Sequence, residues 1–235
     1  MNRLSSTADG DSSAMGRDWL LWQLGDSAFP MGAFGHSGGL EAAWQQGEVR
    51  GGEGLEDFLE ASMIQLGSGA LPFVQAAWAG EQPLAELDAR CDAFFSGHVA
   101  NRASRAQGQA LLASTARAFP VPRLRSLRQG VIEGEQPGHW PVMFGAVGSI
   151  LGLDAGSAAH LFLFMHARGI VSAAVRLGVV GPLEGQSIQY QGLGVVNRVL
   201  RRAKECGVAG VAQTAPLMEI FQGTQDRLYS RLFQS

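Results

Sequence analysis

Residues 35–39 read GHSGG, which fits the G-x-S-x-G pattern of the nucleophile elbow in α/β-hydrolases. An elbow of this kind needs a buried strand before the serine and a histidine late in the chain as its base. Neither requirement is met, because Pro30 interrupts the residues before Ser37 and the last histidine, His166, lies within an apolar helical run. The sequence therefore favours a glycine-rich corner between two helices, and a serine hydrolase that uses Ser37 is the alternative interpretation.

The same stretch has the composition of a tight corner. Glycines at positions 32, 35, 38 and 39 permit positive φ angles and a close approach of the backbone. The hydroxyl of Ser37 is predicted to cap a helix that begins near Gly38, and Glu41 to support its N-terminus through the helix dipole. His36 is predicted to lie at the surface. The predicted structural corner comprises Gly35, His36, Ser37 and Gly38.

The other polar residues offer no complete catalytic or metal-binding set. The five histidines show neither H-x-x-x-H nor H-E-x-x-H spacing, and His160 and His166 lie about 240° apart around a helix. The sequence contains no phosphate-binding G-x-x-x-x-G-K-[ST] motif. Cys91 and Cys206 are isolated, which indicates a reduced, cytoplasmic setting. We therefore expect no catalytic residues, no cofactor and no metal site.

Charged residues are sparse in this chain. They make up 17% of its 235 residues, whereas apolar residues make up 46%, and the net charge is −3. Part of the surface is therefore expected to be buried in a dimer or a partner complex, although a general richness in alanine and glycine is the simpler alternative. No basic cluster favours nucleic acid, and no signal peptide or apolar run of transmembrane length is evident. We expect neither nucleic acid nor a membrane as a partner.

Helical periodicity dominates the sequence, and alternating strand patterns are absent. Apolar residues recur at helical spacing over residues 55–66 and 84–95, and Asp154 has the position of an N-cap before a long helix. The predicted fold is an all-α, single-domain bundle of about eight to ten helices. Its predicted parts are a disordered leader over residues 1–16, the helical domain over 17–224 and a C-terminal tail over 225–235.

Two further features indicate a protein interface. Arg176 follows the small residues of VSAAVRL, where a partner helix can come close and a partner carboxylate can pair with the guanidinium, although a solvated surface arginine fits equally well. The chain ends in DRLYSRLFQS, and Tyr, Phe and Arg are enriched at interfaces. Such a tail either becomes ordered on a partner or packs on its own domain.

Several stretches, in order along the chain, resemble the urease accessory protein UreF family. LLWQLGDSAFPMGAFGHSGGLEAAWQQGEV is similar to the N-terminal signature of the family, HWPVMFGAVGSILGL and VSAAVRLGVVGPLEGQ to its middle and later helices, and YSRLFQS to its C-terminus. The resemblance implies an all-α homodimer without catalysis of its own. It also implies binding to UreD (also called UreH), recruitment of the GTPase UreG, and delivery of nickel to apo-urease driven by GTP hydrolysis in UreG.

The resemblance also extends to single residues. It implies that residues 229–235 dock on UreD/UreH, and that Arg176 takes a basic position, often a lysine in the family, on the surface that faces UreG. His36 stands where many members have a tyrosine, and Gln234 where an arginine is common. The predicted partner-binding residues are Arg176, Tyr229, Ser230, Arg231, Leu232, Phe233 and Ser235.

Overall fold

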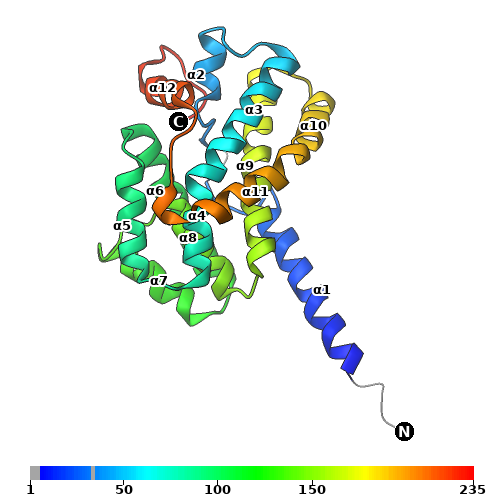
Figure 1. Ribbon diagram of the computed structural model, residues 1–235, viewed down its shortest axis with the longest axis vertical. Helices are drawn as coiled ribbons and strands as arrows, with labels where there is room; N and C mark the ends of the chain where they lie inside the picture. The colour runs from blue at the N-terminus through cyan, green and yellow to red at the C-terminus, as the bar shows by residue number, and fades with distance from the viewer. Residues whose placement is uncertain (1–5, 33–34) are drawn as a thin grey trace.

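The computed structural model describes residues 6–32 and 35–235, and within them it contains twelve α-helices and no β-strand (Figure 1). The predicted all-α fold is confirmed. The helices are α1 (Ser6–Gly25), α2 (Leu40–Gln45), α3 (Gly51–Ser68), α4 (Ala70–Ala79), α5 (Leu84–Phe94), α6 (His98–Ala118), α7 (Pro122–Ile132), α8 (Trp140–Ile150), α9 (Ala155–Leu177), α10 (Pro182–Gln191), α11 (Leu193–Cys206) and α12 (Pro216–Thr224). Two short 3₁₀ helices, η2 (Val208–Gly210) and η3 (Gln225–Arg227), flank α12.

The number of helices is larger than the predicted eight to ten, because glycines divide apolar patterns that continue across them. Gly69 separates α3 from α4, and a Cβ atom at this position would lie 2.7 Å from the ring of Phe94. Gly192 ends α10 and precedes α11, although the sequence pattern over residues 185–206 predicts one continuous helix. Periodicity does not reveal such breaks, since the apolar spacing is helical on both sides.

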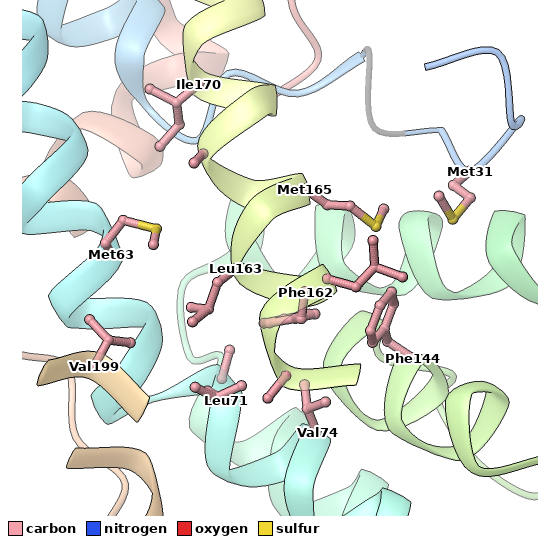
Figure 2. Packing of buried hydrophobic residues seen from close by; sticks show 14 of the residues in the cluster. Met31, Met63, Leu71, Val74, Phe144, Phe162, Leu163, Met165, Ile170 and Val199 are labelled. Carbon is pink, nitrogen blue, oxygen red and sulfur yellow. The ribbon is translucent and has the colours of Figure 1, made fainter. Parts of the chain in front are cut away.

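Helix α9 is the centre of the hydrophobic core. It contacts α1, α2, α3, α4, α8, α10 and α11. Figure 2 shows that its side chains point in several directions: Phe162 lies near Phe144, and their ring centroids are 5.2 Å apart, whereas Leu163 points toward Leu71 of α4. Because neighbours surround it, α9 buries apolar residues on most of its circumference.

The same helix is long and apolar enough to cross a membrane, by length and composition alone. Its mean hydropathy reaches 1.4 over an 18-residue window. The sequence pattern predicts no such segment, because His160 and Arg168 interrupt the apolar run. In the structure 61% of the window is buried inside the fold, so α9 meets these criteria as a core helix.

Helix α1 begins earlier than the sequence predicts. Residues 6–16 belong to this helix, whereas the sequence predicts a disordered leader over residues 1–16; residues 1–5 lie outside the described residues. The polar leader continues directly into the apolar stretch near Trp19, and a helix once started propagates more easily than it nucleates. In Figure 1 α1 extends away from the other helices. At its C-terminal end Leu24 is buried in the core, and Leu20 and Leu21 pack against it.

Asp154 is the N-cap of α9, as the sequence predicts. Its carboxylate accepts hydrogen bonds from the backbone N–H of Ser157 at 2.9 Å and from the Ser157 hydroxyl at 2.7 Å. These bonds, the backbone one first, hold the pKa of Asp154 below its usual value.

Replacing this cap is expected to destabilise the protein. Asp154→Ala should lower the free energy of unfolding by about 1 kcal/mol, because the first turn of α9 loses its acceptor. Urea unfolding followed by circular dichroism measures the change. Asp57→Ala, at an exposed position of α3, is the matched control and should leave the stability nearly unchanged or slightly raised. Equal losses in the two variants would contradict the capping role.

Candidate functional site

The last eight residues return to the glycine-rich corner near the start of the chain. We call residues 228–235 the C-terminal segment and residues 35–39 the glycine corner. The backbone N–H of Gln234 donates to the carbonyl oxygen of Gly35 at 2.7 Å, and the N–H of Ser37 donates to the backbone oxygen of Ser235. The side chain of Gln45 in α2 donates to the carbonyl of Ser230 at 2.9 Å. In Figure 1 the C-terminus accordingly lies beside α2 and α12.

The glycine corner differs in detail from the predicted helix cap. Helix α2 begins at Leu40, and its N-cap is Gly39, which has a φ of 91° and follows Gly38 with a φ of 64°. A Cβ atom at Gly39 would lie 2.9 Å from the backbone nitrogen of Gln222 in α12, so no larger residue fits there without movement. Because these two left-handed residues intervene, Ser37 does not occupy the N-cap position.

Ser37 is 1% exposed and its hydroxyl is committed to the C-terminal segment. The Oγ atom donates to the backbone oxygen of Ser235 at 3.0 Å, and it receives only a long contact of 3.4 Å from the Glu41 N–H. The neighbouring His36 is half-buried, and its Nδ1 atom pairs with the hydroxyl of Ser235 at 2.6 Å. Burial, and secondarily the charge of Arg102, lowers the pKa of His36. Ser37 and His36 therefore do not form a nucleophile–base pair, and the hydrolase alternative has no support in this geometry.

Glu41 holds the C-terminal segment through a buried carboxylate. It is 2% exposed; Oε1 accepts from the Leu232 N–H at 2.6 Å, and Oε2 accepts from the Phe233 N–H at 3.0 Å and the Gln225 Nε2 at 2.7 Å. From its sequence position, Glu41 is predicted only to support the helix N-terminus through the dipole. The available signal was its position among the apolar residues of LEAAW, where a solvent-exposed acid is not expected.

A second carboxylate ties the C-terminal segment to α6 at the surface. Asp226 pairs with Arg102 at 2.9 Å, with Arg231 at 2.7 Å and with His98 at 3.4 Å. The hydrogen bond from Arg102 is the main reason why the pKa of Asp226 is lowered. Arg231, which the sequence predicts as a partner-binding residue, is therefore exposed but already engaged within its own chain.

The structure brings Arg176 and Phe233 together, although they lie 57 positions apart in the sequence. The guanidinium carbon of Arg176 lies 4.5 Å from the centroid of the Phe233 ring. Phe233 is only 3% exposed and Ser235 is also buried. Leu232, in contrast, is 53% exposed, and Tyr229 is fully exposed. The predicted partner-binding residues thus divide into buried residues that attach the segment and exposed ones that face outward.

A cavity of about 190 Å³ lies beneath the glycine corner and α12. Its polar lining includes Ser62, Gln65, His166 and Glu219. Burial lowers the pKa of His166 to about 4, and its Nε2 atom pairs with the Ser62 hydroxyl at 2.5 Å. Burial raises the pKa of Glu219, which accepts a hydrogen bond of 2.6 Å from Gln65. Among residues 6–32 and 35–235, no group of three His, Cys, Asp or Glu side chains is placed to hold a metal ion.

A polar network that no local sequence pattern predicts lies at the start of α8. His139 pairs through Nε2 with Asp92 at 2.9 Å and through Nδ1 with the Ser104 hydroxyl at 3.1 Å. Asp88 accepts from the backbone N–H groups of Gly138 at 2.6 Å and His139 at 3.0 Å, while burial raises its pKa. The Ser104 hydroxyl also accepts a hydrogen bond of 3.2 Å from the N–H of Trp140, the first residue of α8. The network therefore connects α5 and α6 to the N-terminus of α8.

The fold and the site together define a class of protein. It is an all-α protein whose C-terminal segment is attached to its own domain, while some side chains of that segment face outward, as in a binding protein. Comparisons with known proteins narrow the class. The sequence profile of the UreF family matches residues 49–192. Urease accessory protein F of Arabidopsis thaliana is 35% identical over 221 residues, covering 92% of each chain. The protein of the same name from Oryza sativa subsp. japonica is 35% identical, covering 92% of this chain and 84% of its own.

A bacterial relative shows the same correspondence. Urease accessory protein UreF of Trichodesmium erythraeum is 28% identical over 229 residues, which cover 94% of this chain and 98% of the relative. The chain belongs to the UreF family, as the resemblance in its sequence predicts.

Proposed function

We propose that this chain is a urease accessory protein that acts as a binding scaffold in the maturation of urease. It binds the UreD/UreH accessory protein, and together they recruit the GTPase UreG, whose GTP hydrolysis drives nickel insertion into apo-urease. The chain works as a cytoplasmic homodimer, without catalysis or a cofactor of its own. Its membership of the UreF family and the names of its relatives support this proposal.

The observation that carries the proposal is that the C-terminal segment has both buried and exposed apolar side chains. Phe233 is buried, whereas Tyr229 and Leu232 project outward from a backbone that is already fixed. An aromatic and an aliphatic side chain displayed on an ordered segment are typical of residues that anchor an interface. In this proposal Tyr229, Ser230 and Leu232 contact UreD/UreH, while Phe233 and Ser235 attach the segment. The exposed guanidinium of Arg176, which lies over Phe233, contributes to the surface that faces UreG.

Removal of the C-terminal segment tests this function. A chain that lacks residues 229–235 is expected to lose co-purification with UreD/UreH and to lose activation of apo-urease in a reconstituted assay. Its far-ultraviolet circular dichroism should remain helical, because the deleted residues contain no helix. Unchanged co-purification would remove the proposed role of the segment.

A point variant distinguishes contact with UreD/UreH from attachment of the segment to its own domain. Tyr229→Ala keeps every hydrogen bond that fixes the segment and should still weaken retention of UreD/UreH by at least about tenfold, as expected for an aromatic residue at the centre of an interface. Leu183→Ala, an exposed position on α10, is the matched control. If both variants bind the partner as tightly as the wild type, Tyr229 is not part of the interface.

A further inference from the structure

Two consecutive backbone N–H groups of the C-terminal segment converge on one buried carboxylate. The N–H groups of Leu232 and Phe233 donate to the two oxygens of Glu41, at 2.6 and 3.0 Å. In an extended chain, successive N–H groups point to opposite sides. Their convergence on a single anion therefore fixes the direction in which the backbone turns at this point.

This turn decides which side chains face outward. With the two N–H groups held by Glu41, Phe233 enters the protein and lies beneath Arg176, while Leu232 remains 53% exposed. Gln225 completes the arrangement, because its Nε2 atom donates both to Glu41 at 2.7 Å and to the carbonyl of Phe233 at 3.3 Å. A buried carboxylate needs such donors, since an unpaired charge away from water is strongly unfavourable.

The ion pairs that attach the segment at the surface are weaker than the buried bonds to Glu41. Asp226 and its partners Arg102 and Arg231 lie at the surface, where ion pairs contribute little because water and salt screen them. The backbone bonds to the glycine corner hold residues 234 and 235 but leave the turn at residues 232–233 to Glu41.

We infer that Glu41 is a positioning residue for partner docking: its carboxylate holds the C-terminal segment in the binding conformation before a partner arrives. This inference rests on the proposed function. An interface that is ordered in advance loses less conformational freedom on association, so the affinity for UreD/UreH depends on Glu41 although Glu41 itself is buried.

Glu41→Gln in the full-length chain tests the inference. The amide of Gln presents a donor where the carboxylate has its second acceptor oxygen, so the N–H groups of Leu232 and Phe233 cannot both keep their bonds. Hydrogen exchange at these two N–H groups is expected to accelerate by at least about tenfold, and the affinity for UreD/UreH to fall by a similar factor. The helical circular dichroism should be unchanged. Glu41→Asp, which keeps the charge on a shorter side chain, should recover part of both effects.

Glu48→Gln is the matched control, because Glu48 is an exposed acid that lies just after α2. It should change neither exchange nor affinity. Hydrogen exchange that stays slow in Glu41→Gln overturns the inference. Fast hydrogen exchange with undiminished affinity for UreD/UreH also overturns it, but leaves the proposed function intact. A wild-type chain that does not retain UreD/UreH instead removes the proposed function together with the inference. If Glu41→Gln does not fold, Gln225→Met provides the test: it should accelerate exchange at Phe233, and unchanged exchange overturns the inference.

Discussion

Gly145→Ala is expected to lower the free energy of unfolding by about 3 kcal/mol, although alanine is the better helix former. Gly145 lies in α8 where this helix packs against α4. A Cβ atom at this position would collide with the carbonyl oxygen of Val74 and lie 3.0 Å from the Cβ atom of Ala77. The collision is with backbone, so the two helices must move apart, and their buried contacts are lost on both sides. Urea unfolding monitored by circular dichroism measures the change.

Gly169→Ala is the matched control for this prediction. Gly169 also lies inside a helix, α9, but apart from the adjacent backbone of that helix nothing lies within 4 Å of the Cβ position. There the substitution should raise the stability by about 0.5–1 kcal/mol, since alanine restricts the unfolded chain and favours the helix. The two variants are therefore expected to change stability in opposite directions. A Gly145→Ala protein as stable as the wild type would show that α4 and α8 do not approach as closely as the structure indicates.

The stability of the protein is expected to fall by about 3 kcal/mol between pH 6.5 and pH 4 because of His166. Burial lowers the pKa of His166 from 6.5 to about 4 in the folded state. Between these values the unfolded chain binds a proton that the folded chain does not, so stability decreases as the pH falls through this window. Below about pH 4 both states are protonated and the contribution of His166 no longer changes.

Urea unfolding at several pH values, compared between the wild type and His166→Gln, measures this contribution. The variant keeps a neutral polar side chain near Ser62 and should lose most of the decrease between pH 6.5 and pH 4. The pKa of His36 is lowered as well, but His36 is present in both proteins and cancels in the difference. His160→Gln, at an exposed position of the same helix, is the control. If wild type and His166→Gln lose stability in parallel, His166 is not buried in its neutral form.

The local features of this protein could be predicted from its sequence. Apolar periodicity indicated helices, and Asp154 indicated the start of α9. These signals are reliable because they depend on neighbours within one or two turns of the same helix. The ordered motifs also led to the UreF family, which the comparisons confirm. The sequence therefore determined the class of fold, the positions of several helices and the family.

Only the tertiary structure decided how the candidate site is arranged. The partners of Glu41 lie up to 192 positions away, so no local pattern could show that its carboxylate holds Leu232 and Phe233. For the same reason the C-terminal tail read as one partner-binding unit, whereas packing buries Phe233 and leaves Tyr229 exposed. Ser37 likewise resembled a helix cap or a nucleophile until the fold placed the backbone oxygen of Ser235 beside its hydroxyl. Burial and long-range hydrogen bonds, which depend on the whole chain, assign these residues their roles.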